Sequence, residues 1–372
     1  MSNSARNNEP LNGVKVLDLS RVLAGPFATQ MLADLGAEVI KIEHPERGDD
    51  TRQWGPPFVQ AADGTRGNAA YFYCANRNKN FVGIDFKTPE GQKRIKQLAA
   101  DADVLVENYK VDGLKAYGLD YASLKTINPR LVYCSITGFG QTGPYRYRPG
   151  YDFIIQGMSG LMSVTGKADG EPGGEPLRTG VAMADLSSGL HAVSGICAAL
   201  YARNQSNRGC HIDISLLDVQ VSLLSHHATN YLNSGDVPSR IGNTHPNIVP
   251  YQVFSTSDHP IIIAVGNDSQ FARLCETLEQ SAWSESVRFE RNHQRVENRE
   301  ELVSLIQSVL TSQPASHWLE KLHAVNVPAG PVNNLEQVFN DPQVIARNLQ
   351  LRTDTEDTKG VGTVASPIVI KE

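Results

Sequence analysis

Short apolar runs alternate with amphipathic segments along the first half of the chain. Residues 14–20 (VKVLDLS) and 37–43 (AEVIKIE) carry strand-like runs, and residues 25–36 between them carry apolar positions at helical spacing. Two strands joined through a helical crossover pair in parallel, as in a β-α-β unit. The pattern therefore predicts a parallel sheet with helices packed beside it.

The same alternation recurs further along the first half. Strand-like runs follow at 81–86 (FVGIDF), 103–108 (DVLVEN) and 131–136 (LVYCSI). Thr88 and Pro89 occupy the cap and first-turn positions of the helix after the first of these runs. We expect this half to form an open, Rossmann-like α/β layer.

Glycine and proline interrupt the pattern between residues 138 and 180, on both sides of the apolar run 153–164. Loops of this length inside a compact domain are usually functional or mobile. A helix over about 186–203, a strand at 211–215 and a helix through about 232 are predicted to follow. The large α/β domain is therefore expected to span residues 1–232.

A second pattern begins after a linker. Residues 233–250 carry three prolines and two glycines without periodicity. Residues 251–325 predict a strand pair with a turn at Ser257 and Asp258, followed by helices containing FARLCETL, REELVSLIQSVL and ASHWLEKLH. We expect a small α+β domain here, and expect residues 326–372, which end in GVGTVASPIVI, to return to the first domain's sheet.

Composition narrows the class of protein. The chain has 372 residues, 40% of them hydrophobic and 20% charged, as in an ordinary globular protein with two cores. A net charge of -6 gives no global basic field for nucleic acid or an anionic membrane. The five cysteines are widely spaced, the first ten residues are polar, and no 18-residue run is uninterruptedly apolar. We expect a cytoplasmic protein without a signal peptide or a membrane span.

Asp185 is the candidate catalytic residue. It lies where an extended, glycine-containing segment meets a helix rich in small residues. In an arbitrary protein such an aspartate simply caps the helix. A helix N-terminus also favours the ionised form of a carboxyl group, which a nucleophile requires. The residues alone leave both interpretations open.

Several motif-based chemistries are disfavoured. GFGQTG at 138–143 matches G-x-G-x-x-G, but Pro144 and a further loop follow it instead of a helix. We interpret this segment, including Gly140, as a flexible loop near a ligand, with NAD binding as the weaker alternative. Histidines lack metal-ligand spacing, and neither G-x-S-x-G nor a cysteine nucleophile signature occurs. We therefore expect no metal and no Ser or Cys hydrolase, and keep proton transfer at carbon as an alternative.

Basic residues gather at the predicted ends of strands and in the loops that follow. Singly, each is typical of a solvated surface. Their shared placement favours a phosphate-bearing ligand, because open α/β sheets bind ligands at this edge. The residues are Arg77, Lys79, Lys110, Arg146 and Arg148.

Taken together, the ordered segments resemble the class III CoA-transferase family, which includes formyl-CoA transferase, the carnitine CoA-transferase and α-methylacyl-CoA racemase. The matching blocks extend over nearly the whole chain. They include VLDLSRVLAGPFATQMLADLGAEVIKIE, NRNKNFVGIDFKTPEG, ADVLVENY, NPRLVYCSITGFGQTGPY, ADLSSGLHAVSGICAAL and HIDISLLDVQ.

The resemblance implies a covalent mechanism. Asp185 with Gly189 matches the family's D-x-x-x-G block. By that resemblance, the Asp185 carboxylate attacks an acyl-CoA thioester to give a mixed anhydride, which the released CoA converts to an aspartyl-CoA thioester. The acceptor acid then takes CoA through a second anhydride. Such intermediates must be shielded from water.

The resemblance also implies a CoA site and no tightly bound cofactor, since the CoA thioester is itself a substrate. Lys79 matches the family's N-K block, and Asn108 with Tyr109 matches its E-N-F/Y block. The complete set of expected CoA-binding residues is Val22, His44, Arg77, Lys79, Asn108 and Tyr109.

Two positions bear on the branch of the family. Leu23 stands where formyl-CoA transferase has glutamine, which disfavours oxalate as acceptor. Tyr151 stands where the racemase has histidine, and tyrosine is a poor base at neutral pH. A formyl-CoA:oxalate transferase, a racemase and a binding protein of the same fold remain alternatives.

The segments CSITGFGQTGPY, SHHATNYL and HPNIVPYQVF resemble the succinyl-CoA-dependent branch that acts on glutarate, itaconate or mesaconate. A second carboxylate on the acceptor needs cationic or hydrogen-bond donor groups. Candidate substrate-binding residues are Leu23, Gly140, Arg146, Arg148, Tyr151, Asn243 and His245. The family fold further implies an interlocked homodimer, with the linkers near 203–250 and 325–335 suited to the threading.

Overall fold

The computed structural model describes residues 9–354, 358 and 360–371, so the polar residues 1–8 lie outside the described part. The chain divides into two compact units. Unit 1 comprises the chain up to Met162, Arg178–Val237 and the chain from Pro342, and unit 2 comprises Ser163–Leu177 and Pro238–Asp341. The glycine-rich segment after Met162 thus belongs with the second unit, whereas the sequence assigned it to the first domain.

Unit 1 is built on a six-stranded sheet in which all neighbours are parallel. The strand order is β5 (Asn80–Gly83), β2 (Glu38–Glu43), β1 (Lys15–Asp18), β6 (Val104–Glu107), β7 (Val132–Thr137) and β8 (His211–Ser215). Chain order reverses between β1 and β6, as in a Rossmann fold. Ligands of such sheets bind beyond the carboxyl ends of the strands at this reversal. The expected α/β fold is confirmed.

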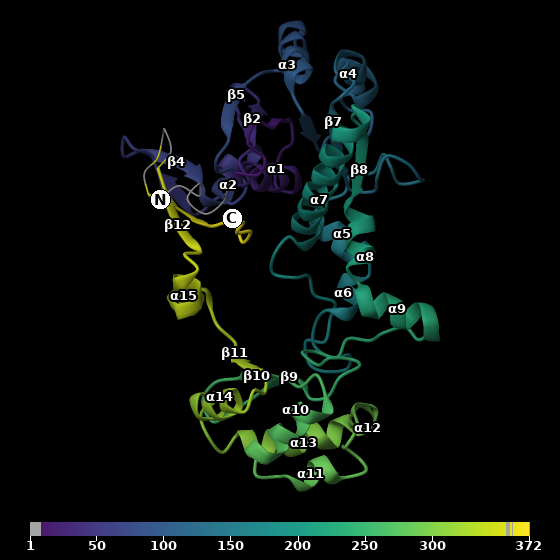
Figure 1. Ribbon diagram of the computed structural model, residues 1–372, viewed down its shortest axis with the longest axis vertical. Helices are drawn as coiled ribbons and strands as arrows, with labels where there is room; N and C mark the ends of the chain where they lie inside the picture. The colour runs from purple at the N-terminus through teal and green to yellow at the C-terminus, as the bar shows by residue number, and fades with distance from the viewer. Residues whose placement is uncertain (1–8, 355–357, 359, 372) are drawn as a thin grey trace. The chain divides into compact units, whose positions relative to one another are not determined.

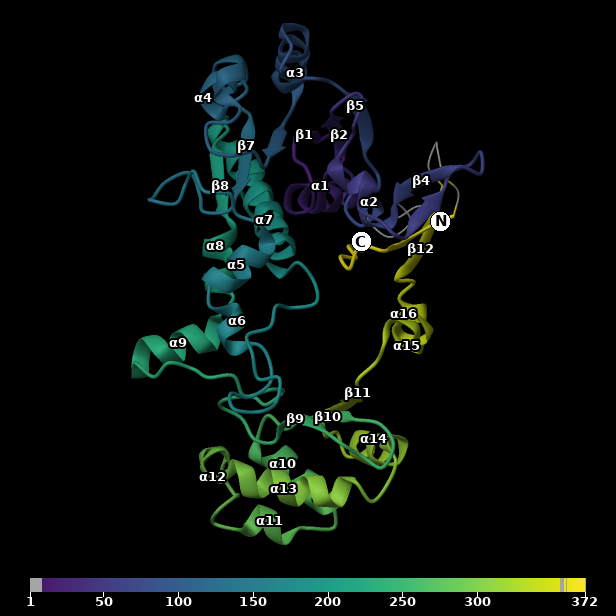
Figure 2. The ribbon, with the colours of Figure 1, turned by 180° about the vertical axis from the view of Figure 1, so that it is seen from behind.

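Helices cover both faces of the sheet (Figures 1 and 2). Val104 and Val106 of β6 pack with α1 (Ala24–Asp34) and α7 (Met183–Ser206), while Leu105 packs with α3 (Pro89–Asp101) and α4 (Tyr121–Ile127). Burial on both faces explains why the inner strands β6 and β7 read as largely apolar runs.

The start of α3 and the course of α7 follow the sequence closely. Thr88 Oγ accepts the Gly91 N–H (3.0 Å), and Pro89 is the first helical residue, as predicted. The helix α7 has 24 residues and is apolar enough by length and composition to cross a membrane. Here it packs against α1, α8 (Leu216–Ser222), β7 and β8 as the central helix of unit 1.

Smaller elements complete unit 1. They are the 3-10 turns at Asp50–Gln53 and Lys115–Tyr117, the hairpin of β3 (Phe58–Gln60) and β4 (Arg66–Ala69), and helices α2 (Ala70–Tyr73), α5 (Asp152–Met158), α9 (Ser225–Ser234) and α16 (Pro342–Ala346). Helix α6 (Leu161–Val164) spans the boundary between the two units. The tail forms β12 (Gln350–Thr353) and β13 (Val361–Val364), which pair with each other. The prediction that the tail joins the parallel sheet is wrong, because the two strands satisfy one another's backbone groups in their own hairpin.

Unit 2 is the expected small α+β domain with its own core, which includes Phe254 and Trp318. Strands β9 (Tyr251–Phe254) and β10 (Ile261–Ala264) pair antiparallel as predicted, and β11 (Ala329–Pro331) adds a third strand. Its helices are α10 (Asp268–Thr277), α11 (Ala282–Glu285), α12 (Asn292–Glu297), α13 (Arg299–Leu310), α14 (Ala315–Ala324) and α15 (Leu335–Asn340). Pairing of β11 with β10 keeps the chain in unit 2 beyond the predicted boundary at 325.

Candidate active site

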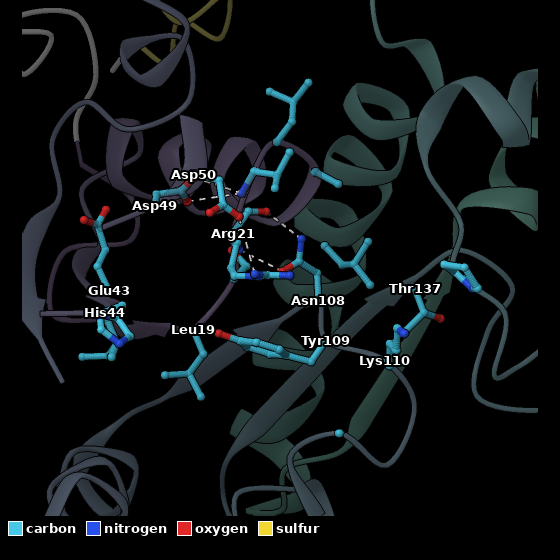
Figure 3. Close-up of a pocket in the computed structure, with 18 of the residues that line it drawn as sticks. Leu19, Arg21, Glu43, His44, Asp49, Asp50, Asn108, Tyr109, Lys110 and Thr137 are labelled. Carbon is cyan, nitrogen blue, oxygen red and sulfur yellow. Dashed lines mark hydrogen bonds and ion pairs between the residues drawn. The ribbon is translucent and has the colours of Figure 1, made fainter. Parts of the chain in front are cut away.

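A cavity of about 550 Å³ lies in unit 1 at the carboxyl edge of the parallel sheet. This volume falls within the usual range of small-molecule sites. Residues at the ends of β1, β2, β6 and β7 and in the loops that follow contribute to its walls (Figure 3), and Asp185 at the start of α7 also lines it. Ten residues singled out from the sequence line it: Val22, Leu23, His44, Asn108, Tyr109, Lys110, Arg146, Arg148, Tyr151 and Asp185.

Lys79 does not line the cavity. Its side chain is fully buried, and its ammonium group donates to Asp18 Oδ2 (3.1 Å), the Pro26 carbonyl (2.8 Å) and Asn76 Oδ1 (3.0 Å). All three N–H bonds are therefore used within the protein. In this conformation Lys79 ties the end of β1 to the first turn of α1 and has no proton left for a ligand.

Four further residues from the sequence-based set lie elsewhere. The Arg77 guanidinium is bonded to Asp34 of α1 (Nε to Oδ1, 2.9 Å). Gly140, with a positive φ of 81°, is not among the lining residues. Asn243 and His245 belong to unit 2.

The loop after β1 is fastened on two sides. Asn108 accepts the Arg21 N–H (2.8 Å) and donates to the Arg21 carbonyl (2.7 Å), as Figure 3 shows. Asp49 accepts the Val22 N–H (3.2 Å) and is paired with the fully buried Lys41 (3.1 Å). Val22 has a φ of 69°, a strained conformation for a β-branched residue. These bonds hold strained backbone against the cavity.

Cationic side chains from several loops surround the cavity. Arg21, Arg47 and Lys87 were missed by sequence reasoning, although Arg21 and Lys87 directly follow strand-like runs. Arg148 stacks over Tyr145 at 3.9 Å. The cationic side chains of the lining are Arg21, Arg47, Lys87, Lys110, Arg146 and Arg148, whereas Lys41 is fully buried and paired with Asp49. This lining suits a ligand with several phosphate charges.

Asp185 is the third residue of α7, not its N-cap. The cap position is Ala182, which makes no side-chain hydrogen bond, so the simple capping interpretation is wrong. Burial, followed by the nearby Asp152 carboxylate, raises the pKa of Asp185 to about 7. The pKa of Asp185 is thus raised, whereas the sequence led us to expect a carboxyl group whose ionised form the helix terminus favours.

Two aromatic residues that sequence reasoning missed lie near this carboxyl. The charges of Asp185 and Asp152 contribute to the raised pKa of Tyr71, which reaches about 12 chiefly through burial. The Tyr71 ring contacts that of Trp54 edge-on at 5.4 Å between centroids, and Trp54 lines the cavity. Both residues come from the irregular region around β3 and β4, where the sequence offers no periodic signal.

Glu107 is a further carboxyl group with a raised pKa, and it lies directly before the cavity residues Asn108 and Tyr109. It ends β6, is 6% exposed, and accepts the Tyr109 N–H at Oε2 (2.7 Å). Burial raises its pKa to about 7. Glu107 thus orients the Asn108 and Tyr109 segment from beneath while those residues face the cavity.

Residues 11–372 match the family model described as CoA-transferase family III. The chain belongs to this family. It is 49% identical to a succinate–glutarate CoA-transferase of Agrobacterium fabrum, over 100% of this chain and 92% of that protein. It is 46% identical to a Homo sapiens succinyl-CoA:glutarate CoA-transferase, over 98% of this chain and 80% of that protein. The crystal structure of a CAIB/BAIF family protein from Brucella suis has a TM-score of 0.84 and 48% identity, covering 98% of this chain and 93% of the other.

The resemblance inferred from the sequence blocks is confirmed, and this family III chain is an enzyme of the transferase class. A CoA thioester brings phosphate charges and an electrophilic carbonyl carbon to its enzyme. The lining of the cavity combines cationic side chains with the carboxyl group of Asp185. With its pKa raised to about 7, a part of the Asp185 carboxyl groups is protonated at neutral pH.

Proposed function

We propose that this enzyme transfers CoA from succinyl-CoA to a dicarboxylic acid, with glutarate as the first candidate and itaconate or mesaconate as others. The observation that carries the proposal is the carboxyl group of Asp185 on a cation-lined cavity at the sheet's switch point. Support for the substrates comes from relatives named for succinate or succinyl-CoA and glutarate, which are nearly half identical over almost the whole chain.

In the proposed reaction the Asp185 carboxylate attacks the thioester carbonyl carbon of succinyl-CoA, and the C–S bond breaks to release CoA thiolate. The thiolate attacks the aspartyl carbonyl of the mixed anhydride, releasing succinate and leaving an aspartyl-CoA thioester. Glutarate carboxylate displaces the thiolate to form a second anhydride. Thiolate attack on its glutaryl carbonyl then gives glutaryl-CoA and restores Asp185.

The surroundings of Asp185 suit this sequence of steps. Anhydrides and thioesters hydrolyse in water, so the nucleophile must work where water is scarce. The burial that raises the pKa of Asp185 limits the access of water to this carboxyl group. A raised pKa also keeps the carboxylate more basic than a solvated one, at the cost of a protonated fraction at neutral pH.

The binding roles are assigned accordingly. In the proposal, CoA is bound by Val22, His44, Asn108 and Tyr109 together with the cationic side chains of the cavity. Arg77 and Lys79 instead hold α1 in place, through hydrogen bonds to Asp34 and to the Pro26 carbonyl. On the acceptor side the proposed residues are those that line the cavity of unit 1, Leu23, Arg146, Arg148 and Tyr151.

The decisive experiment pairs a substrate screen with detection of the covalent intermediate. Succinyl-CoA is incubated with glutarate, itaconate, mesaconate and oxalate, and acyl-CoA products are identified by mass. With succinyl-CoA alone, the peptide containing Asp185 is expected to gain the mass of CoA less water. Asp185→Asn is expected to lose turnover at least about a thousand-fold while still binding CoA, and Asp218→Asn, in the first turn of α8, serves as control.

Three outcomes contradict the proposal. One is undiminished turnover in Asp185→Asn, and another is a CoA adduct on a different residue. The third is appreciable α-proton exchange of a 2-methylacyl-CoA in deuterium oxide, which is the racemase reaction that Tyr151 argues against.

We also propose that the enzyme works as a cytoplasmic homodimer. All five cysteines are free thiols, in keeping with a reducing compartment. Large apolar side chains of unit 1 stand exposed, including Tyr201, Leu232 and Val237. Burying such side chains against a second copy of the chain would remove their apolar surface from water.

A further inference from the structure

The aspartate of the Gly150-Tyr151-Asp152 block has no part in the reaction as proposed so far. Asp152 is the first residue of α5, and its Oδ1 accepts the N–H groups of Ala184 (2.8 Å) and Asp185 (3.4 Å). These are N–H groups of the first turn of α7, for which a helix has no internal acceptors. Since Ala182 offers no capping side chain, Asp152 supplies the cap of α7 from a different helix.

The Asp152 carboxylate is itself held in one orientation. Its Oδ2 accepts a hydrogen bond from Gln156 Nε2 (2.7 Å), and the Gln156 side chain is completely buried. Gln156 Oε1 in turn accepts the Thr179 N–H (2.9 Å) in the segment leading to α7. A chain of three side-chain and backbone contacts therefore fixes the acceptor beneath the nucleophile.

We propose that Asp152 is a positioning residue for CoA transfer, which fixes the first turn of α7 through its N–H groups and places a like charge beside Asp185. The inference rests on the proposed function, in which Asp185 is the nucleophile. A neighbouring negative charge disfavours ionisation of a carboxyl group. This agrees with the raised pKa of Asp185, for which Asp152 is the second cause after burial.

Asp152 is the charged group that contributes to the raised pKa of Asp185. The Tyr71 phenol of α2 is a further titratable group near Asp185. Other titratable or charged groups occur on α7 itself and on the elements packed against it. They are His191, Cys197, Tyr201 and Arg203 of α7, Asp34 of α1, Asp218 of α8, Tyr133 and Cys134 of β7, and His211 and Asp213 of β8.

Asp152→Asn tests the inference, because it keeps an oxygen acceptor and removes the charge. The acid limb of the kcat/KM profile for succinyl-CoA is expected to move down by about one pH unit. At pH 8, kcat should fall by roughly ten-fold to a hundred-fold through looser positioning. Since Asp152 does not line the cavity, the KM for succinyl-CoA should change by less than about three-fold.

Asp152→Ser provides a second neutral cap, and Asp218→Asn provides a matched loss of charge in another helix packed on α7. The acid limb should shift in the same direction for the Ser variant and stay in place for the Asp218 control. Thermal melting followed by circular dichroism shows which of the two Asp152 variants is folded, and the pH profile of a folded variant is then compared with that of wild type. If Asp152 had only a structural role, its variants would lose stability but the acid limb of the kcat/KM profile would not move to lower pH.

The inference is overturned if the acid limb of the folded neutral variant stays at the wild-type position or moves up. This result is distinct from a failure of the proposed function. If the CoA adduct forms on Asp185 and Asp185→Asn is inactive, the nucleophile stands and only the role of Asp152 is lost.

Discussion

The side chain of Asp185 makes its own contribution to the pH dependence of stability. In the unfolded chain an aspartic acid ionises near pH 4, whereas in the folded enzyme its pKa is raised to about 7. The folded state therefore binds more protons between these values, and stability is lost as pH rises through that window. We predict that Asp185→Asn is more stable than wild type at pH 8, by about 1–3 kcal/mol, and that the difference vanishes toward pH 4.

Urea unfolding at pH 4.5 and pH 8 measures the difference in unfolding free energy between wild type and Asp185→Asn. We expect a smaller difference than the full pKa shift of Asp185 would give, because Asp185 is partly exposed. Asp218→Asn, at an exposed position, should show no comparable pH dependence. Equal stability of wild type and Asp185→Asn at both pH values would mean that burial does not penalise the Asp185 charge.

Lys79 permits a second prediction for a single residue. Its amine is buried and donates three hydrogen bonds, whereas Lys87 and Lys110 are exposed on the cavity. We predict that an amine-acetylating reagent at pH 8 modifies Lys87 and Lys110 but not Lys79, and that CoA protects the two exposed lysines. Peptide mass spectrometry gives the result. Modification of Lys79 that CoA prevents would restore it as a direct ligand.

At the scale of elements, the loop after β1 depends on its two-bond attachment to Asn108. Asn108→Ala removes both bonds to Arg21 and should release the strained backbone at Val22. We predict a rise in the KM for succinyl-CoA of about ten-fold or more, with a smaller effect on kcat. Steady-state kinetics and calorimetric titration with CoA measure the change.

Asn128 offers a matched control for this loop. Its amide donates to the carbonyls of Ala99 (3.0 Å) and Ala102 (2.8 Å), on the amino side of β6 and β7 and away from the cavity. Asn128→Ala should cost stability of about 1–3 kcal/mol through unpaired carbonyls and leave the KM unchanged. An equal rise of KM in both variants contradicts a specific role for the loop.

Local patterns predicted the elements that depend on local interactions. The parallel strands, the Thr88 cap and the β9–β10 pair follow from periodicity and capping chemistry within short windows. The tail strand was wrongly predicted to join the parallel sheet, whereas β13 pairs with β12. The sequence of a single strand does not indicate which partner strand it pairs with. Unit boundaries shifted for the same reason, because β11 is held by its pairing with β10.

In the candidate site, too, local sequence patterns predicted some features and missed those that depend on distant residues. Sequence placed basic residues at the carboxyl ends of strands, and many of them do line the cavity. The direction of each side chain, however, depends on distant partners. Lys79 turns toward Asp18, 61 positions earlier in the chain, and Asp152 reaches Ala184, 32 positions later. Such pairings leave no periodic trace in a single sequence.

At the scale of the whole molecule, several large apolar side chains of unit 1 are highly exposed. Tyr201 of α7 is 71% exposed, Leu232 of α9 is 78% exposed, and Val237 is 81% exposed. We predict a homodimer, with a mass by light scattering of twice 40.6 kDa at micromolar concentration. Burial of these side chains against a second copy would remove apolar surface from water and stabilise the pair.

Leu232→Asp should weaken that association, because a carboxylate at a buried interface loses its hydration without gaining a partner. The expected result is a monomer–dimer equilibrium that shifts to the monomer on dilution. Gln97→Asp adds the same charge at an exposed position of α3 and should remain dimeric. A wild-type mass of 40.6 kDa at micromolar concentration contradicts the dimer, and an unchanged dimer in Leu232→Asp excludes α9 from its interface.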